Sequence, residues 1–378
     1  MEDRSRINRR DFLRMAGMAG IVLAGSACAP AAVPPTAAPT KAPAPTTASA
    51  ATAKPAATTA PAALKPGEMR AQLYELAKKE GQVVVYSSGT SADIEAYRKV
   101  FSKTYPGIEI KEFVGTAEQA AQKMLTEFSA GKVNADLVVI TLEQWAMVIK
   151  AGAVEKWDPP ERPNFPAEAI DPGGFYITEQ TAVHVMEYNT QLVGPADAPK
   201  SYADLLKPFF KGKLGVEQAA YSWLAQRAQI WGKDKALEYA KNLAAQQPKF
   251  ISGNTALSDA VGSGEVYAAL NVYQHRVEDQ KKKGSPVQWV ADQPTGAESV
   301  ASGLTKGAPH PNAGKLFYDW RLSEEGQKVT LDGLSRYPTR TGMPIPGPLQ
   351  VKVALPTMET ALGTPAYGVL FKQIFGLI

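Results

Sequence analysis

The stretch GQVVVYSSGTS, residues 81–91, decides the fold of this 378-residue chain. Its four consecutive apolar or aromatic residues, 83–86, predict a strand that is buried on both faces. The polar residues that follow predict a short turn and a helix N-terminus, because Thr90 or Ser91 can cap a helix that has Asp93 in its first turn. A buried strand that leads through a polar loop into a helix is typical of a parallel α/β domain.

The loop after this strand is a candidate ligand site. It would lie outside the carboxyl end of the strand, where open α/β sheets bind ligands. Ser87, Ser88 and Thr90 offer hydroxyl groups, and free backbone N–H groups could receive an anion or a polar small molecule. The alternative is a capped turn without a ligand, and this stretch alone leaves both readings open.

Two further strand–helix units follow. Residues 108–114 alternate apolar and polar side chains as a strand does, and residues 116–119 fit a helix capping box. Residues 135–140 predict another buried strand, which ends at Thr141, with Glu143 opening the next helix. Three such units predict a parallel sheet with right-handed crossovers. Further strands are predicted at 174–177, 181–188, 212–217, 266–272, 287–290 and 299–304, with helices at 222–231, 234–245, 255–262 and 274–283 and a C-terminal helix from about Gly368.

Residues 1–28 are predicted to be an export signal. Residues 8–14, NRRDFLR, resemble the twin-arginine motif, and the apolar residues 15–27 are too few to span a bilayer as a mature helix. Cys28 is the only cysteine of the chain, so it has no disulfide partner there. Its surroundings resemble a bacterial lipoprotein signal, although Gly25 stands where that motif usually has leucine. We therefore expect lipidation of Cys28, and the alternative is ordinary cleavage near Ala27.

Residues 29–66 are predicted to be a disordered tether. They are almost entirely Ala, Pro and Thr, and such a segment cannot bury enough apolar surface to offset its ordering entropy. The tether would hold a folded, soluble body from residue 67 onward near the outer side of the cytoplasmic membrane. The 41 Lys and Arg residues nearly balance the 37 Asp and Glu residues, which argues against a nucleic-acid partner.

The chain resembles the extracellular solute-binding proteins of ABC importers, specifically the two-lobed group that includes ferric-iron binders. The likeness covers about residues 76–344 and rests on the order of many short stretches rather than on one motif. These stretches are 81–88 (GQVVVYSS), 105–108 (YPGI), 130–138 (AGKVNADLV), 188–193 (YNTQLV), 201–206 (SYADLL), 211–215 (KGKLG), 264–270 (GEVYAAL), 325–327 (EGQ) and 337–340 (YPTR).

The resemblance implies an α/β fold of the two-lobed, periplasmic-binding-protein-like type II class. Two hinge strands would cross between the lobes near residues 183–188 and 294–300. One lobe would comprise 67–185 with 295–344, and the other 186–294 with 345–378. Closure about the hinge would bury the ligand. The resemblance also implies a monomer that delivers its ligand to an ABC permease and has no resident cofactor.

The family's ferric-iron binders use a Tyr-Tyr pair and a histidine in the first loop. Here the matching stretch reads Tyr273-Gln274-His275, and Thr90 stands near the place of the histidine. If Fe³⁺ were the transported ligand, Tyr273, His275 and Glu143 would be its ligands, since hard cations prefer oxygen donors. Departures at both places argue against iron.

The remaining candidate residues favour a small polar organic solute, with an organic anion as one candidate. Asn254 matches a family position that binds an anion, and Tyr221, Ser222 and Trp223 stand where other anion contacts occur. Aromatic walls with a few hydrogen-bonding groups suit such a ligand. The alternative for Tyr221 and Trp223 is core packing, and His184 lies mid-strand, where a core role is expected.

The sequence holds no G-x-S-x-G elbow, HExxH pair, dinucleotide fingerprint or P-loop motif. We therefore expect a binding protein rather than an enzyme. The predicted function is an extracytoplasmic solute-binding lipoprotein of an ABC importer. The alternatives are a ferric-iron-binding protein and a tethered hydrolase with a dispersed triad.

Overall fold

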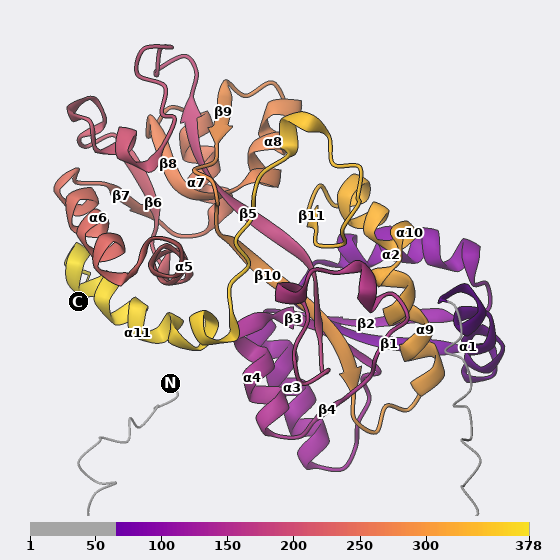
Figure 1. Ribbon diagram of the computed structural model, residues 1–378. Helices are drawn as coiled ribbons and strands as arrows, with labels where there is room; N and C mark the ends of the chain where they lie inside the picture. Colours follow the sequence, from indigo (N-terminus) through magenta and orange to yellow (C-terminus); the bar gives the residue numbers. More distant parts are fainter. Residues whose placement is uncertain (1–65, 378) are drawn as a thin grey trace, which may run out of the picture. The chain divides into compact units, whose positions relative to one another are not determined.

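A computed structural model describes residues 66–377 (Figure 1). The predicted signal, Cys28 and nearly all of the predicted tether lie outside the described residues. In the first half of the described chain the elements are α1 (Pro66–Glu80), β1 (Gln82–Ser87), α2 (Ser91–Thr104), β2 (Glu109–Val114), α3 (Ala117–Ser129), β3 (Leu137–Thr141), α4 (Leu142–Lys150), β4 (Val154–Glu155), β5 (Ile177–Asn189) and β6 (Leu214–Glu217). The second half contains α5 (Tyr221–Trp231), α6 (Lys233–Ala245), β7 (Lys249–Ile251), α7 (Asn254–Gly262), β8 (Ala268–Tyr273), α8 (Gln274–Lys282), β9 (Val287–Val290), β10 (Ala297–Thr305), α9 (Pro311–Leu322), α10 (Glu324–Lys328), β11 (Tyr337–Pro338) and α11 (Met358–Phe375).

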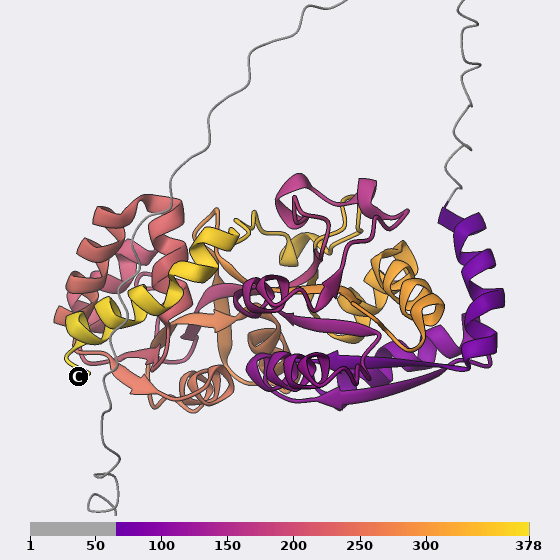
Figure 2. The ribbon, with the colours of Figure 1, turned by 90° about the horizontal axis from the view of Figure 1, so that it is seen from below.

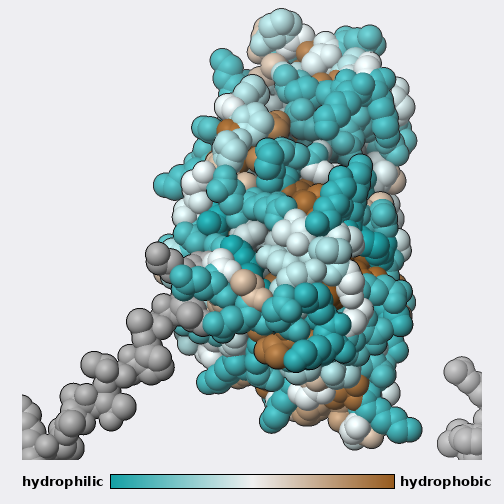
Figure 3. Space-filling model, turned by 90° about the vertical axis from the view of Figure 1, so that its right-hand side faces the viewer, coloured by the Kyte–Doolittle hydropathy of each residue, from teal (hydrophilic) through white to brown (hydrophobic). Residues whose placement is uncertain are grey.

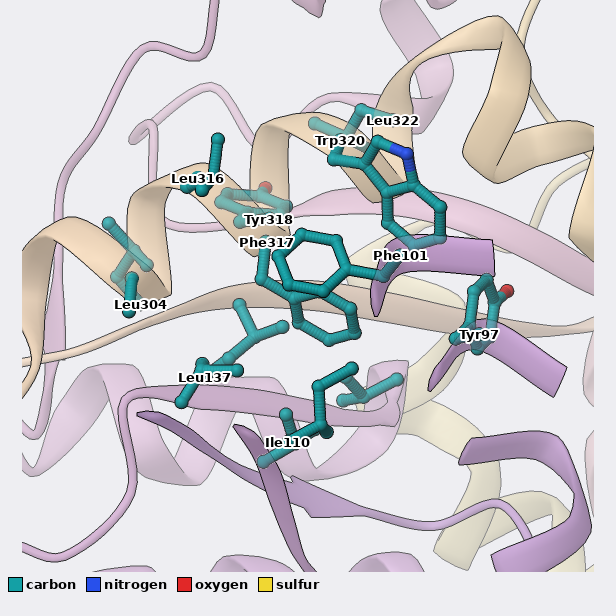
Figure 4. Packing of buried hydrophobic residues seen from close by; sticks show 14 of the residues in the cluster. Tyr97, Phe101, Ile110, Leu137, Leu304, Leu316, Phe317, Tyr318, Trp320 and Leu322 are labelled. Carbon is teal, nitrogen blue, oxygen red and sulfur yellow. The ribbon is translucent and has the colours of Figure 1, made fainter. Parts of the chain in front are cut away.

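The first sheet has the strand order β2-β1-β3-β10-β5. β1 pairs in parallel with both β2 and β3, which confirms the parallel strand–helix units predicted from the sequence, whereas β10 is antiparallel to β3 and β5. Aromatic side chains from α2 and α9 fill the core beside this sheet (Figure 4). Phe101 meets Phe317 at 4.9 Å and Trp320 at 5.1 Å between ring centroids, both edge to face. This packing fixes α2 and α9 against the strands whose ends carry the predicted first loop.

The second sheet has the order β5-β8-β6-β7, with β9 also paired to β5. β6 is parallel to β7 and β8, so the carboxyl ends of these three strands lie at one edge. Its core contains Trp223, Leu224 and Phe371, which are fully buried. α5, α6 and α11 cover this core (Figures 1 and 2).

β5 joins the two sheets. The sequence predicted two strands at 174–177 and 181–188, but β5 is one strand of 13 residues, Ile177–Asn189. Its first half pairs with β10 and β11, and its second half pairs with β8 and β9. The polar residues Thr178, Glu179 and Gln180 between the two predicted strands made the stretch look interrupted, yet their side chains are buried.

α11 begins ten residues before the predicted start at Gly368. Pro365 lies inside the helix, and proline usually ends a helix because it lacks an N–H group and crowds the preceding turn. Tertiary packing offsets this cost: Ala361 packs with side chains of α4, and Phe371 packs with those of α5. α11 therefore runs from α4, beside the first sheet, to α5 and α6, beside the second (Figure 2).

The face over α1 is mostly hydrophilic, with hydrophobic side chains in separate small areas (Figure 3). Isolated apolar side chains are normal on a protein surface. None of the helices described between residues 66 and 377 combines the length and apolar character that crossing a membrane requires.

Candidate functional site

Three parallel strands of the second sheet end at one cavity. β6, β7 and β8 lead within a few residues into α5, α7 and α8, so three helix N-termini lie at this edge of the sheet. The cavity has a volume of about 710 Å³, which is typical of small-molecule sites. Its lining includes Glu217, Ser222, Asn254, Tyr273, Arg276 and Glu298.

Tyr273 lies at the centre of this site. Its hydroxyl group donates a hydrogen bond of 2.5 Å to Glu298 on β10, and its backbone N–H donates to the side-chain oxygen of Asn254 at 3.1 Å. The rings of His184 and His275 stack nearly parallel to the Tyr273 ring, each at 5.5 Å between centroids. The stack joins β5, β8 and the first turn of α8, so it fixes the tyrosine at the junction of the two sheets.

Burial sets the protonation state of this stack. The pKa of Tyr273 is well above 10, because burial and the neighbouring carboxylate of Glu298 both disfavour a phenolate. The pKa values of His184 and His275 are lowered to about 3, chiefly by burial and then by nearby arginines, Arg227 for His184 and Arg336 for His275. At neutral pH the tyrosine is therefore a hydrogen-bond donor and both imidazoles are uncharged.

Carboxylates surround the tyrosine. The carboxylate of Glu217 accepts backbone N–H groups of Ala219 at 2.6 Å and Gly253 at 3.2 Å, which fixes the loops that open α5 and α7. Glu143 of α4 lies near enough to Glu298 that burial and then this second carboxylate raise its pKa. The side of the cavity near β10 is therefore acidic.

The helix N-termini at the cavity attract anions, and the carboxylate of Glu217 already accepts the N–H groups of Ala219 and Gly253 there. Each helix N-terminus carries unpaired backbone N–H groups and the positive end of the helix dipole. Gly253, Asn254 and Thr255 at the start of α7 line the cavity, as do Ser222 in α5 and Arg276 in α8. Such an arrangement can hold a carboxylate or a phosphate group.

The structure brings together three of the predicted ligand-binding residues: Ser222, Asn254 and Tyr273 all line the cavity. His275 lines a separate cavity of about 200 Å³ between α8 and the loop before β11, with Ser335 and Arg336. The predicted ferric set of Tyr273, His275 and Glu143 is therefore divided between neighbouring spaces. Among residues 66–377 no group of three or more His, Cys, Asp or Glu side chains is placed to hold a metal ion.

The predicted ligand-binding residues after β1 (Ser87, Ser88 and Thr90) and at the end of β3 (Thr141) make local structural contacts. The Oγ of Ser87 accepts the N–H of Gly89, and the Ser88 N–H donates to Val139. Thr90 caps α2 in a capping box. The hydroxyl of Thr141 donates to Gln144 at 2.5 Å. These contacts form the capped turn that the sequence left open as the alternative, and none of the four residues lines the 710 Å³ cavity.

Tyr221 and Trp223 do not line the cavity, and their packing fits the alternative that the sequence left open, a place in the core. Trp223 is fully buried in the core and its indole N–H donates to the hydroxyl of Tyr202 at 3.2 Å. Tyr221 packs against Phe371 and Gly368 of α11. The reason is helical periodicity: α5 already begins at Tyr221, and successive helical residues point about 100° apart, so only Ser222 of the three faces the cavity.

The sequence reasoning missed Glu217, Asn271, Arg276 and Glu298, which also line the cavity. Glu217 could have been found, because it is the last residue of a predicted strand. Asn271 has a backbone φ of +64°, a conformation in which asparagine is enriched among non-glycine residues, but no local pattern marked it. Glu298 reaches the cavity only because β10 crosses beside β5, which no sequence signal reveals.

Three comparisons place the chain among known proteins. Residues 96–357 match the family model of bacterial extracellular solute-binding proteins. Iron uptake protein A1 of Synechocystis is 24% identical over 296 residues, which cover 73% of this chain and 80% of that protein. Iron-bound HitA from Pseudomonas aeruginosa has a TM-score of 0.67 at 23% identity, covering 78% of this chain and 99% of that one.

AfuA from Actinobacillus pleuropneumoniae, with fructose-6-phosphate bound, has a TM-score of 0.60 at 23% identity, and the match covers 79% of this chain and 97% of that one. At these identities the structural matches show a shared fold, the two-lobed α/β fold of periplasmic binding proteins. Because the family match spans more than half of the sequence, this chain belongs to the bacterial extracellular solute-binding protein family.

Proposed function

We propose that this protein captures a small organic anion in the cavity at the carboxyl ends of β6, β7 and β8 and delivers it to the permease of an ABC importer. The observation that carries the proposal is the convergence of three helix N-termini and Arg276 on one cavity of about 710 Å³. Backbone N–H groups and a guanidinium bind carboxylates and phosphates strongly, because the hydrogen bonds are charge-assisted.

Closure of two lobes would complete the site. The lobes are 67–185 with 295–344 and 186–294 with 345–378, and the chain crosses between them in β5 and just before β10. Residues at the strand ends of the first lobe, including Ser87, Ser88, Thr90 and Thr141, would then approach the solute. Burial between lobes excludes water and strengthens each polar contact.

A ferric ion is the second candidate ligand. In its favour, Tyr273, Glu298 and Glu143 present hard oxygen atoms near one another, and iron uptake protein A1 of Synechocystis is a relative. Against it, Tyr273 is a protonated donor to Glu298, and His275 faces another cavity. The geometry therefore favours the organic anion.

The same proposal covers location and partners. The twin-arginine signal would export the chain, lipidation of Cys28 would anchor it on the outer side of the cytoplasmic membrane, and residues 29–66 would hold the binding body near the permease. The protein would act as a monomer, without catalysis and without a nucleic-acid partner.

Native mass spectrometry of the purified full-length chain tests this function. We expect an extra mass, relative to the denatured chain, that matches a small organic anion. An extra mass that matches iron would shift the function to the second candidate. If no mass is retained, a thermal-shift panel of organic anions should raise the melting temperature, and the absence of any shift would contradict the proposed function.

A further inference from the structure

The cavity contains charges of both signs that do not neutralise each other. The side chain of Arg276 makes no hydrogen bond and no ion pair with any of the residues described. Neither oxygen of Glu298 is part of an ion pair within that range, and one of them accepts the hydroxyl of Tyr273. Buried or half-buried charges are normally paired, because removing them from water costs several kcal/mol per ion.

The unpaired Arg276 and Glu298 come from different elements of the cavity lining. Arg276 belongs to the first turn of α8 and lies beside the helix N-termini. Glu298 lies on β10, with Glu143 of α4 as a second carboxylate close by. Arg276 stays more than 4 Å from Glu217, Asp259 and Glu298 at its charged atoms, since no ion pair joins it to them. A solute that occupies the cavity therefore meets one unpaired guanidinium and the carboxylates of Glu217, Asp259 and Glu298.

Two buried polar atoms give independent evidence that a ligand completes this site. Asn271 and His184 line the cavity and are 3% and 1% exposed, yet the Oδ1 atom of Asn271 and the Nδ1 atom of His184 have no hydrogen-bond partner among the described residues. Asn271 also holds a left-handed backbone, which costs energy and persists where function requires it. An amide oxygen accepts hydrogen bonds only, so Asn271 requires a ligand that donates them.

We infer that the solute is a zwitterion, an organic anion whose other end carries an ammonium group. This inference rests on the proposed function and specifies its substrate class. The anionic group binds the N-termini of α7 and α8 with Arg276. The ammonium group binds the carboxylate of Glu298 and a hydrogen-bond acceptor such as Asn271. One molecule then pairs both the guanidinium of Arg276 and the carboxylate of Glu298.

Two matched sets of compounds test the inference by isothermal titration calorimetry on the full-length chain. The first set is 2-aminoethyl phosphate, ethyl phosphate and ethanolamine, and the second is 4-aminobutyrate, butyrate and butylamine. In at least one set the zwitterion should bind about tenfold or more tightly than either analogue that carries charge of one sign only, since a charge-assisted hydrogen bond contributes enough for that factor. Phosphate and carboxylate heads are distinguished by which set responds.

Three variants test which residue binds which charged group of the solute. Glu298→Gln keeps an acceptor for Tyr273 but removes the negative charge, so the zwitterion should bind no better than the singly charged anion. Arg276→Gln should weaken the zwitterion and the anion equally. Lys283→Gln removes an exposed charge beyond the end of α8 and should leave all affinities unchanged. Circular dichroism melting curves confirm that each variant is folded.

The outcomes separate this inference from the proposed function. If in neither set the zwitterion binds more tightly than the corresponding anion, or if no zwitterion binds at millimolar concentration while native mass spectrometry shows another solute, the zwitterion inference is overturned and solute capture stands. If native mass spectrometry and the thermal-shift panel also detect no ligand, the proposed function fails as well.

Discussion

At the scale of the residue, Tyr273 connects the cavity to the crossing strands. Its hydroxyl group bonds to Glu298 on β10, its backbone N–H to Asn254 of α7, and its ring lies between two imidazoles. One side chain therefore links the binding surface to β5, β8 and β10. Substitutions here are expected to change solute affinity and the stability of the hinge together.

Tyr273→Phe should destabilise the protein by about 1.5–3 kcal/mol, because it removes a hydrogen bond to a charged group and leaves Glu298 without that donor. Urea unfolding monitored by circular dichroism measures the change. Tyr188→Phe is the matched control, since Tyr188 is half-buried and no hydrogen bond of its hydroxyl group is found in the structure. Equal losses in the two variants would contradict the assigned role of the Tyr273 hydroxyl.

His184 predicts a specific pH dependence. Its pKa is lowered from 6.5 to about 3 by burial, so the unfolded chain binds a proton more readily than the folded one between these values. The contribution of the neutral, buried His184 to the free energy of unfolding is complete above pH 6.5 and is lost as the pH falls toward 3. About 2 kcal/mol of this contribution is lost by pH 5. Glu187, whose pKa burial raises to about 8, acts in the opposite direction over part of this range.

The measurable quantity is therefore the difference between the wild type and His184→Gln. The wild type should lose more unfolding free energy than the variant between pH 7 and pH 5 in urea titrations. Parallel pH profiles would show that His184 is not neutral and buried in the folded protein. Glu187→Gln is the matched control, since it removes the opposing titration and should steepen the loss on acidification.

Candidate residues at strand ends could be predicted from the sequence, because a strand end in a parallel sheet is a local pattern with a known location. Asn254 and Tyr273 were found through the resemblance to the family, at positions that match its ligand contacts. Glu298 and Arg276 could not be found, because their approach to the cavity depends on how β10 crosses and how α8 is oriented. For Trp223 the sequence left a ligand wall and core packing open, and only the packing of α5 against the second core, including Tyr202, decides for the core.

At the scale of the element, β10 is the most constrained strand. It lies between β3 and β5 in the middle of the first sheet and also pairs with β4. Gly303 is required there for close packing: a methyl group on it would meet the backbone oxygen of Phe175 and, at 2.6 Å, the indole ring of Trp145. The strand can pass between these groups only without a side chain at this position.

Gly303→Ala should destabilise the protein by at least about 1–3 kcal/mol, the usual cost of overpacking, because one of the clashing atoms belongs to the backbone. Gly194→Ala is the control, since no atom lies within 4 Å of the added methyl group. Thermal unfolding of both variants measures the effect. A melting temperature of Gly303→Ala equal to that of the control would contradict the described packing of β10.

Elements with strong local signals were predicted well, and elements held by tertiary contacts were not. α2 and α3 have the capping residues and apolar periodicity that the sequence displayed. β5 contains buried polar residues and α11 contains Pro365. The local sequence preference therefore disfavours a continuous strand in β5 and a continuous helix in α11. Pairing on both sides of β5 and packing of α11 against α4 and α5 overcome that preference, and neither can be read from a local window.

At the scale of the whole binding body, two α/β sheets share β5, and the cavity lies beside this shared strand. A solute held there contacts one sheet directly and the other through Glu298. Under the proposed function we expect binding to change the angle between the sheets. The central claim is that the two lobes close on the solute.

Electron paramagnetic resonance distance measurement tests that claim most directly. Spin labels attached in the variant Cys28→Ser, Lys150→Cys, Lys241→Cys report the separation of α4 and α6, whose labelled residues are exposed. The account predicts that the co-purifying solute, or the compound with the largest thermal shift, changes the distance distribution to a single closed population. It also predicts that Asn254→Trp, which fills the cavity, abolishes the change. Binding of the compound with an unchanged distance distribution would contradict capture by closure.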